Sequence, residues 1–262
     1  MNGRLKETMV KNKCQVYFVG AGPGDPELLT IKGQKVIKQS DLVLYAGSLV
    51  PKKVVDVAKK GAQVVDSSSM NLEETHALMM ETVKAGGTVA RVHTGDPSLY
   101  GAVKEQMILL DREGIGYEVI PGVTVAFAAA AAAKISFTLP EKTQTLIFTR
   151  LSGRTPVPDQ EQLRDLARHK TSLAIYLSAS NTKRIVEELI SAGYAEDTHI
   201  NMAYRVGWPD EMILSSPLSE LAQTVKDRDI NRQAVFLVLP GQDEEETFSK
   251  LYSPDFGHGF RK

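Results

Sequence analysis

The chain has 262 residues, a formal net charge of −1 and 42% hydrophobic residues. This length and apolar content predict one large α/β domain or two smaller ones. The near-neutral charge argues against bulk nucleic-acid binding, which usually shows as an excess of basic residues. The single cysteine, Cys14, cannot form an internal disulfide, so we expect a reducing, cytoplasmic setting.

The sequence also argues against export, membrane spanning and metal binding. Residues 1–13 are polar and contain no apolar h-region, so we expect no signal peptide. No apolar run reaches the roughly 18 residues that a membrane span needs. The alanine-rich stretch Phe127–Ala133 instead predicts a tightly packed helix. No His, Cys or carboxylate spacing indicates a metal site.

The first half of the chain alternates between strand-like and helix-like patterns. Apolar spacing typical of helices occurs at Leu72, Thr75, Met79 and Val83, and again at Val103, Met107 and Leu110. Strands are predicted at Gln15–Gly20, Leu42–Ala46, Ala62–Ser67, Thr88–Thr94 and Tyr117–Ile120. This alternation indicates βα units and a mainly parallel sheet.

The pattern breaks near Leu139–Thr143 and then restarts. Helical spacing returns at Ile185 and Leu189 and in a last helix, for which Ser216-Pro217 is a candidate cap. Strands are predicted at Thr145–Thr149, Leu173–Ser178, Ile200–Val206, Met212–Ser215 and Ala234–Leu239. We therefore predict two α/β domains, residues 14–139 and 143–242, with mainly parallel or mixed sheets and a ligand cleft between them.

Two loops place a Gly-Asp-Pro unit directly after a predicted strand, at Gly24-Asp25-Pro26 and Gly95-Asp96-Pro97. Aspartate followed by proline suits a helix start, with Asp as the N-cap. Asp96 could cap the helix that leads to Val103, or it could accept hydrogen bonds from a ligand. Asp25 stands where a dinucleotide fingerprint needs its third glycine, which argues against an ordinary NAD site.

The segments Val19–Glu27, Arg91–Gly101 and Pro121–Thr124 together resemble the tetrapyrrole methylase family, and the likeness extends from about Gln15 to Leu239. The resemblance implies two α/β domains with a cofactor cleft between them, use of S-adenosylmethionine, a tetrapyrrole substrate and a homodimer. The near-neutral charge and the lack of a long apolar run predict that the chain has no nucleic-acid partner and no membrane partner.

Two further segments, Leu44–Pro51 and Tyr204–Glu211, are similar to the branch of this family that methylates C11 of precorrin-4. The likeness favours the cobalt-containing substrate of the anaerobic cobalamin pathway. The cobalt-free substrate of the aerobic pathway is the near alternative. An RNA methyltransferase of the same fold and a non-catalytic binding protein are the alternatives from other classes.

The resemblance also implies which residues contact S-adenosylmethionine, with contributions from both halves of the chain. These residues are Pro23, Thr94, Gly95, Asp96, Leu99, Tyr100, Thr124, Val125, Leu177, Ala203, Tyr204 and Ala234. Methyl transfer from a sulfonium is an in-line displacement that needs mainly positioning, so no catalytic base is named.

A tetrapyrrole carries several carboxylates, for which arginine is the natural partner through bidentate hydrogen bonds. We favour Arg150 and Arg154 for this role, because they follow a predicted strand end near the joint between the halves. The other candidates are Arg91, Arg205, Lys32 and His93.

Overall fold

The computed structural model describes residues 14–241, 248–253, 256–257 and 259. The chain divides into two compact units. The first comprises Met1–Val125 and Gly207–Pro209, and the second comprises Ala126–Val206 and Asp210–Lys262. The predicted joint near Leu139–Thr143 therefore lies inside the second unit, and the short segment 207–209 belongs to the first.

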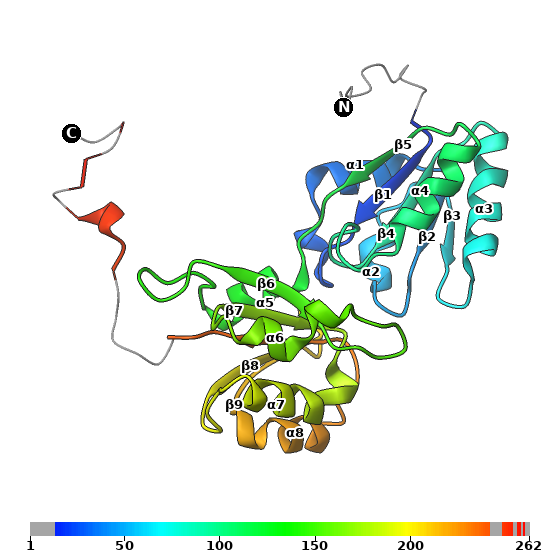
Figure 1. Ribbon diagram of the computed structural model, residues 1–262. Coiled ribbons are helices and arrows are strands. Elements are labelled where there is room, and N and C mark those ends of the chain that lie inside the picture. The colour runs from blue at the N-terminus through cyan, green and yellow to red at the C-terminus, as the bar shows by residue number, and fades with distance from the viewer. Residues whose placement is uncertain (1–13, 242–247, 254–255, 258, 260–262) are drawn as a thin grey trace, which may run out of the picture. The chain divides into compact units, whose positions relative to one another are not determined.

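The first unit contains a five-stranded sheet in which every neighbouring pair of strands is parallel. The strand order is β3-β2-β4-β1-β5 (Figure 1). The strands are β1 (Val16–Gly20), β2 (Leu42–Tyr45), β3 (Gln63–Asp66), β4 (Val89–His93) and β5 (Tyr117–Ile120). All five predicted strands of this half are confirmed, with ends that differ by at most one residue.

Helices cover both faces of this sheet, as Figure 1 shows. They are the 3-10 helix η1 (Pro26–Leu28), α1 (Ile31–Gln39), α2 (Lys52–Val55), α3 (Leu72–Lys84) and α4 (Val103–Arg112). Residues of α3 and α4 pack with Phe18 and Leu44 on one face. Residues of α1 and α2 pack with Val19 and Val43 on the other face. The alternating side chains of buried parallel strands explain these two separate cores.

The strand order of the first unit determines which loops are neighbours. Strands β4, β1 and β5 lie side by side and run in the same direction. The loops that follow them therefore begin at one edge of the sheet, at His93, Gly20 and Ile120. In open parallel sheets this carboxyl edge is the usual place for a ligand.

The second unit contains a mixed sheet with the order β6-β7-β10-β8-β9. Its strands are β6 (Leu146–Arg150), β7 (Ser172–Tyr176), β8 (His199–Tyr204), β9 (Met212–Pro217) and β10 (Ala234–Val238). Only β6 and β7 are parallel; the other neighbouring pairs are antiparallel. The five strands predicted for this half are confirmed, with ends that shift by up to two residues.

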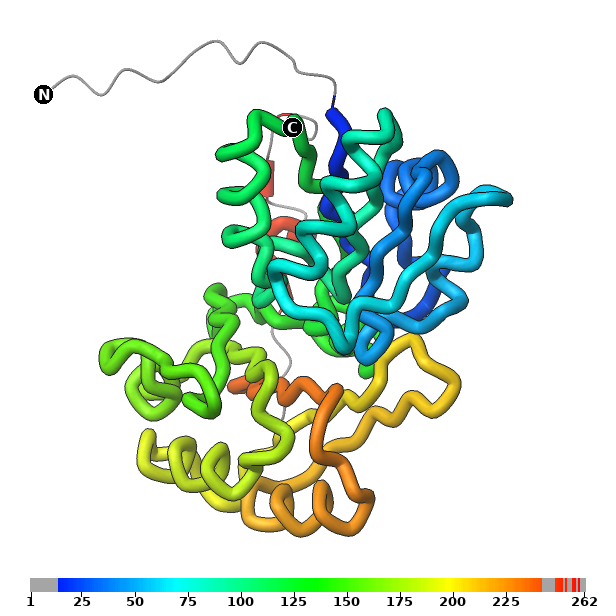
Figure 2. Tube along the Cα trace, turned by 90° about the vertical axis from the view of Figure 1, so that its right-hand side faces the viewer, coloured from blue at the N-terminus to red at the C-terminus, as the bar shows by residue number. Residues whose placement is uncertain are grey.

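Helices α6 (Leu163–Ala167), α7 (Thr182–Ser191) and α8 (Leu218–Asp227) of the second unit contribute to one large core. The unit also contains α5 (Val125–Ala133) and the 3-10 helices η2 (Asp159–Glu161), η3 (Ala179–Asn181) and η4 (Lys250–Tyr252). Helices α7 and α8 lie next to each other (Figure 2). Their apolar residues, including Ile185 and Leu221, join Phe236 in this core.

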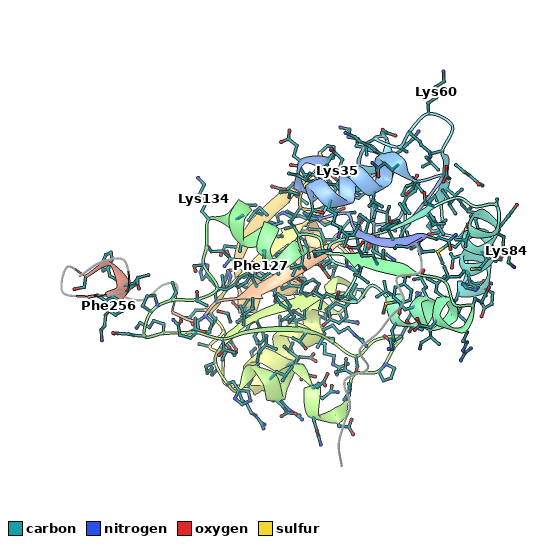
Figure 3. The ribbon with its side chains drawn as sticks, turned by 90° about the horizontal axis from the view of Figure 1, so that it is seen from above. Lys35, Lys60, Lys84, Phe127, Lys134 and Phe256 are labelled. Atoms are coloured by element: carbon teal, nitrogen blue, oxygen red, sulfur yellow. The ribbon has the colours of Figure 1, made fainter. Side chains whose placement is uncertain are left out.

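Helix α5 explains why the second unit begins at Ala126. The Ala126 amide donates a hydrogen bond to the Tyr176 hydroxyl at 3.3 Å. The ring of Phe127, labelled in Figure 3, packs edge-on against Phe137 and Phe148 at 5.8 Å between centroids. The alanine-rich helix predicted for this stretch is thus confirmed. Its ring contact with Phe148 attaches it to β6, and its hydrogen bond to Tyr176 attaches it to β7.

The Ser216-Pro217 pair predicted as the cap of α8 does precede this helix, but Ser216 is not its N-cap. Helix α8 has Pro217 as its N-cap and no side-chain hydrogen bond at this position. Ser216 instead belongs to β9, where it pairs with Ile200, because the strand continues through Pro217. In the part of the chain that the structure describes, no helix has both the length and the hydropathy required to cross a bilayer.

Candidate functional site

Two of the glycine-containing loops form a short backbone pairing beyond the carboxyl edge of the first sheet. Gly22 and Gly95 exchange both backbone hydrogen bonds, at 3.2 Å and 2.8 Å. The Ala21 amide also donates to the carbonyl of His93, at 2.7 Å. The loops after β1 and β4 are therefore held as an extension of the sheet, and both come from segments that predicted a site.

The loop after β5 joins them through very close backbone contact. A Cβ atom placed on Gly20 would lie 2.5 Å from the Gly122 nitrogen and 2.8 Å from the Gly95 oxygen. A Cβ atom on Gly122 would overlap the same carbonyl oxygen and lie 2.8 Å from the Gly20 Cα. Because the obstacles are backbone atoms, no side-chain movement can make room. These positions require glycine to bring the three loops together.

Asp96 ties two of these loops by its side chain. Its Oδ2 accepts a hydrogen bond from the Gly122 amide at 2.9 Å, and its Oδ1 accepts one from Ser98 at 2.8 Å. The expectation that Asp96 could cap the helix that leads to Val103 is wrong, because the N-cap of α4 is Ala102. Both carboxylate oxygens of Asp96 thus stabilise the loops that follow β4 and β5.

Asp25 behaves as its sequence predicts. It is the N-cap of η1, with Pro26 at the first position, and its Oδ1 accepts a hydrogen bond from the Glu27 amide at 2.9 Å. The carboxylate thereby stabilises the turn that ends the loop after β1.

The segment Gly207–Pro209 packs against the same loop of the first unit. The Trp208 indole Nε1 donates to the Pro23 carbonyl at 3.2 Å. Gly207 has a φ of 78°, and a Cβ atom there would lie 2.5 Å from the Asp25 nitrogen. Sequence reasoning did not find this role, because no periodicity links residues so far apart. The Tyr204–Glu211 resemblance was the only signal.

Two of the predicted cofactor residues have strained backbones. Tyr100 and Leu177 have φ values of 56° and 50°, in the left-handed region that non-glycine residues rarely adopt. Both residues are also exposed to solvent, Tyr100 by 42% and Leu177 by 66%. Strained residues of this kind concentrate at ligand sites, where the surrounding structure holds them.

In the first unit, the structure gathers every predicted cofactor residue at one edge. Pro23 lies in the loop after β1. Thr94, Gly95, Asp96, Leu99 and Tyr100 follow β4, and Thr124 and Val125 follow β5. These three strands are neighbours and parallel, so their loops start at the same sheet edge.

In the second unit, the remaining four also share an edge. Strand β7 ends just before Leu177, while the antiparallel β10 begins at Ala234 beside it. Ala234 pairs with Tyr204, and Val235 pairs with Ala203. The register therefore places Leu177, Ala203, Tyr204 and Ala234 close together along this edge, although they come from three separate segments.

The other basic candidates are engaged in contacts within their own units. Lys32 forms an exposed ion pair with Glu118. The Arg205 Nε lies 2.8 Å from Asp210 Oδ1 in an ion pair. Because a carboxylate already pairs with each of these two charges, Lys32 and Arg205 are less suited to binding substrate carboxylates than an unpaired arginine is.

Arg91 and His93 lie in the core and not on a binding surface. Arg91 donates hydrogen bonds to Gln106 Oε1 at 3.2 Å, to Ser67 Oγ at 2.8 Å and to the carbonyl of Leu44 at 3.3 Å. Burial lowers the pKa of Arg91 to about 10. Among the described residues no carboxylate pairs with it. Arg91 is therefore a structural cation that holds α4 and the end of β3 to the sheet.

His93 is 6% exposed and makes a hydrogen bond with the Gly101 backbone. Burial, together with the charge of Arg91, lowers the pKa of His93 to about 3. The imidazole is thus neutral at physiological pH and packs against the ring of Phe18, 5.9 Å between centroids. It contributes to the position of the Tyr100–Ala102 segment rather than to proton transfer.

The two favoured arginines differ sharply in their surroundings. The Arg150 guanidinium donates to the carbonyls of Leu151, Thr155 and Pro156 at 2.8–3.2 Å. Arg154 is exposed, and within the described part of the chain it makes no hydrogen bond or ion pair. Arg150 therefore holds the backbone of the loop after β6. The guanidinium of Arg154, in the same loop, is available to bind an anion.

A separate hollow of about 500 Å³ lies at the opposite edge of the first sheet, where β2, β3 and β4 begin. Its lining residues include Asp41, Gln63 and Glu81 and contain no predicted site residue. Asp41 is already paired there with Lys59 at 2.7 Å. Among the described residues no group of three or more His, Cys or carboxylate side chains could hold a metal ion.

Comparison with known proteins identifies the family. Residues 15–222 match the model of the tetrapyrrole (corrin/porphyrin) methylases. The chain belongs to the tetrapyrrole methylase family. A cobalt-precorrin-4 C(11)-methyltransferase of Priestia megaterium is 47% identical over 95% of this chain and 98% of its own length. A precorrin-4 C(11)-methyltransferase of Pseudomonas aeruginosa is 46% identical over 94% of this chain and 98% of its own.

Solved structures of tetrapyrrole methylases share the fold. A cobalt-precorrin-4 methyltransferase structure superposes with a TM-score of 0.83 at 48% identity, covering 86% of this chain and 94% of the other. A uroporphyrin-III C-methyltransferase from Thermus thermophilus, complexed with S-adenosylhomocysteine, gives a TM-score of 0.71 at 28% identity, covering 86% and 97%. The predicted two-sheet α/β fold of a tetrapyrrole methylase is thus confirmed.

Taken by itself, the carboxyl edge of the first unit carries loops that a cofactor such as S-adenosylmethionine could contact. A Cβ atom on Gly95 would have only Thr124 Cα and the Val123 oxygen within 4 Å, so an adenosine or an amino-acid moiety can approach this backbone closely. The exposed ring of Tyr100, which follows β4 at this edge, suits a flat base.

The glycine contacts generate a first prediction. Gly122→Ala places a methyl group against backbone atoms of Gly20 and Gly95, and we expect the free energy of unfolding of the first unit to fall by about 1–3 kcal/mol. Binding of S-adenosylhomocysteine should weaken as the loops separate. Fluorescence of Trp208, the only tryptophan, follows unfolding of this unit in urea. Gly153→Ala is the control, because a Cβ atom there meets nothing within 4 Å. Equal stability of both variants would contradict the packing argument.

A second prediction concerns acid stability. The folded pKa of His93 lies at about 3, below the 6.5 of the unfolded chain. Between these values the unfolded state binds a proton that the folded state does not, so this contribution to stability falls as pH decreases from about 6.5. The slope reaches about 1.4 kcal/mol per pH unit. His93→Gln should flatten the stability profile between pH 6.5 and 4 relative to wild type. His169→Gln, at an exposed position, should leave the profile unchanged.

Proposed function

We propose that this protein transfers a methyl group from S-adenosylmethionine to C11 of cobalt-precorrin-4 in the anaerobic pathway of cobalamin biosynthesis. The observation that carries this proposal is the 47% identity, across nearly the full length of both chains, to a cobalt-precorrin-4 C(11)-methyltransferase. Gly20 and Gly122, which the loop contacts require, and Gly95, which has a positive φ, lie within the residues that match the family.

The cofactor supplies an electrophilic methyl group, so the protein's part is to bind, orient and exclude water. We assign the first unit's loops after β1, β4 and β5 and the second unit's edge at Leu177, Tyr204 and Ala234 to cofactor binding. Asp96 keeps its carboxylate occupied by backbone amides, which argues for a positioning role and not for proton transfer. No general base is required for the displacement itself.

We assign Arg154 to recognition of a substrate carboxylate. Its guanidinium is exposed and has no internal partner among the described residues, whereas Arg150 is occupied by three backbone carbonyls. A planar guanidinium can bind a propionate or acetate side chain of the tetrapyrrole through two parallel hydrogen bonds. Arg150 supports this interaction indirectly, since it determines the course of the loop.

A second candidate substrate is the cobalt-free precorrin-4 of the aerobic pathway. The Pseudomonas aeruginosa relative that acts on precorrin-4 is 46% identical, so overall likeness barely separates the two. An RNA substrate is disfavoured by the net charge of −1, because RNA-binding surfaces are usually basic. From the family resemblance we further propose a cytoplasmic homodimer, which light scattering on the purified protein would test.

The proposed activity predicts both a ligand response and a product. S-adenosylhomocysteine should raise the melting temperature, since a ligand that binds only the folded state stabilises it by about 2.7 kcal/mol at a hundredfold excess over its dissociation constant. NAD should have no effect. Incubation with S-adenosylmethionine should convert cobalt-precorrin-4 to a singly methylated product, which mass spectrometry detects. A faster reaction with precorrin-4 would favour the aerobic substrate, and a thermal shift with NAD alone would overturn the assignment.

The assignment of Arg154 makes a further prediction. Arg154→Ala should weaken tetrapyrrole binding about tenfold or more, because a charge-assisted hydrogen bond contributes about 1.5–3 kcal/mol. Arg154→Lys should recover only part of this loss, since lysine keeps the charge and lacks the planar fork. S-adenosylhomocysteine affinity, measured by calorimetry, should stay unchanged in both variants. Normal tetrapyrrole affinity in Arg154→Ala would place the carboxylate site elsewhere.

A further inference from the structure

The loop that carries Arg154 is held from both ends by side chains that no sequence motif marked. We define the Arg154 loop as residues 151–157, between β6 and η2. Residues 153–156 are exposed, whereas Leu151 and Val157 at its ends are buried. A loop exposed in this way normally varies in conformation. Here, however, hydrogen bonds from neighbouring elements fix its backbone carbonyls.

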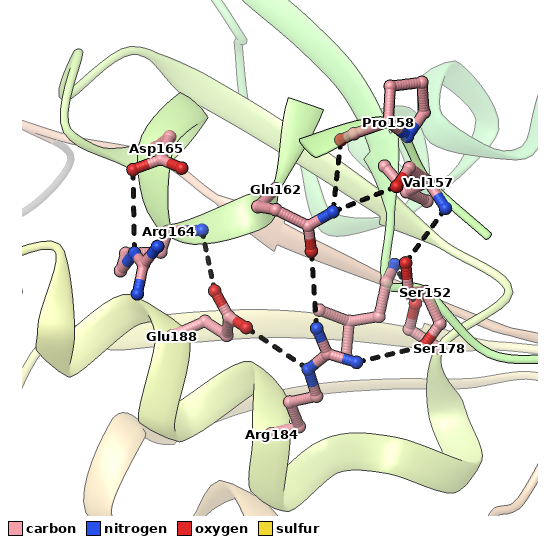
Figure 4. A network of polar contacts seen from close by, with 10 residues as sticks. Ser152, Val157, Pro158, Gln162, Arg164, Asp165, Ser178, Arg184 and Glu188 are labelled. Carbon is pink, nitrogen blue, oxygen red and sulfur yellow. Dashed lines mark hydrogen bonds and ion pairs between the residues drawn. The ribbon is translucent and has the colours of Figure 1, made fainter. Parts of the chain in front are cut away.

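One of these elements is α7, which contributes Arg184 (Figure 4). The Arg184 Nη1 donates to the Ser152 carbonyl at 3.1 Å, and its Nη2 donates to Gln162 Oε1 at 3.4 Å. The Gln162 amide in turn donates to the carbonyls of Val157 and Pro158 at 3.0 Å and 3.1 Å. Arg184 therefore reaches the start of the loop directly and its end through Gln162.

The charge of Arg184 is compensated locally. Its Nε lies 3.2 Å from Glu188 Oε1, one helical turn further along α7. The other carboxylate oxygen of Glu188 accepts a hydrogen bond from the Arg164 amide at 3.0 Å. Because this ion pair neutralises the charge of Arg184, its guanidinium serves as a set of hydrogen-bond donors in a fixed position. It does not serve as a site for an anionic ligand. Arg154 lacks any such compensation.

Ser178 connects the same loop to the candidate cofactor edge. Its buried hydroxyl accepts a hydrogen bond from the Leu151 amide at 2.9 Å and donates one to the Tyr176 carbonyl at 2.7 Å. Ser178 directly follows Leu177, whose side chain is exposed on that edge. The base of the Arg154 loop and the strained turn at Leu177 are thus parts of one hydrogen-bonded framework within the second unit.

We propose that Arg184 is a positioning residue for substrate recognition, which holds the Arg154 loop in the conformation that presents Arg154 to a tetrapyrrole carboxylate. This inference rests on the proposed function for the identity of the substrate. Ordering a flexible loop at the moment of binding reduces affinity, so a loop that is already ordered binds more tightly. The internal bonds of Arg150 and the external bonds of Arg184 provide that order from two sides.

The test compares Arg184→Met with Arg184→Lys and with the control Arg168→Met. Methionine keeps much of the apolar stem and removes all donors, whereas lysine keeps the charge without the fork. Arg168 is a matched control, because it is an exposed arginine of the same unit, paired with Asp165 at 3.2 Å, and makes no bond to the loop. Circular dichroism melts confirm that each variant is folded.

Two readouts separate positioning from general stability. The first is the rate at which trypsin cleaves after Arg154 in the folded protein, because native-state cleavage follows the population of open conformations. The second is the pair KM and kcat for the tetrapyrrole, with S-adenosylhomocysteine affinity as reference. Arg184→Met should accelerate cleavage about threefold or more and raise KM about three- to tenfold, with kcat and cofactor affinity unchanged. Arg184→Lys should lie between Arg184→Met and wild type, and Arg168→Met should match wild type.

Cleavage at the wild-type rate in Arg184→Met would overturn the proposal. Faster cleavage with an unchanged KM would also overturn it, because the loop would then be held without serving the substrate. If wild-type protein methylates none of the tetrapyrroles, the proposed function fails and the substrate role fails with it. The cleavage rates still decide, without any substrate, whether Arg184 holds the loop.

Discussion

The close backbone contact among Gly20, Gly95 and Gly122 is the constraint on which the first unit depends. Three loops can meet at this distance only if their strands are adjacent, parallel and in register, as β4, β1 and β5 are. The Asp96 carboxylate then accepts an amide hydrogen bond from the third loop, which fixes the start of the chain leading into α5. Strand order, register and loop chemistry are therefore parts of a single arrangement.

The two units use buried or partly buried guanidinium groups in different ways. Arg91 has no carboxylate partner among the described residues and is satisfied by a hydroxyl, an amide and a carbonyl oxygen. Removing such a charge from water costs free energy, and the hydrogen bonds to three neutral partners offset part of this cost. The three partners come from three separate segments of the chain. Arg150 and Arg184 instead remain partly hydrated and bind loop carbonyls. The hydrogen bonds of Arg91 hold helix α4 against the first sheet. The hydrogen bonds of Arg150 and Arg184 hold the backbone of an exposed loop in one conformation.

All ten strands in the described part of the chain could be predicted, because buried strands are short, apolar and rich in β-branched residues. Prediction was weaker for elements that lack these patterns. Helix α1 was not predicted, since Gly33 and the charged residues around it obscure the helical spacing, although Thr30 caps the helix through its hydroxyl. The five residues of α6 are too few for a periodic signal. The helix cap offered for Asp96 was wrong, because the partners of its carboxylate, Ser98 and Gly122, belong to loops.

The loops of the candidate site could be predicted where a sequence motif directly follows a predicted strand, as it does after β1, β4 and β5. The burial of Arg91 was not predictable, because a cation within a strand usually faces solvent. The contact of Trp208 with Pro23 was equally hidden, since the two residues are 185 positions apart. Long-range contacts of this kind arise from the path of the chain and leave no periodic trace in the sequence.

That path has a consequence for synthesis in the cell. The first unit includes Gly207–Pro209, although its other residues end at Val125. At translation rates of about 5–20 residues per second, several seconds separate the emergence of the β5 loop from that of Trp208. During this interval the nascent sheet exists without the indole that binds the Pro23 carbonyl. The loop after β1 therefore gains its contact with Trp208 only after most of the second unit has been made.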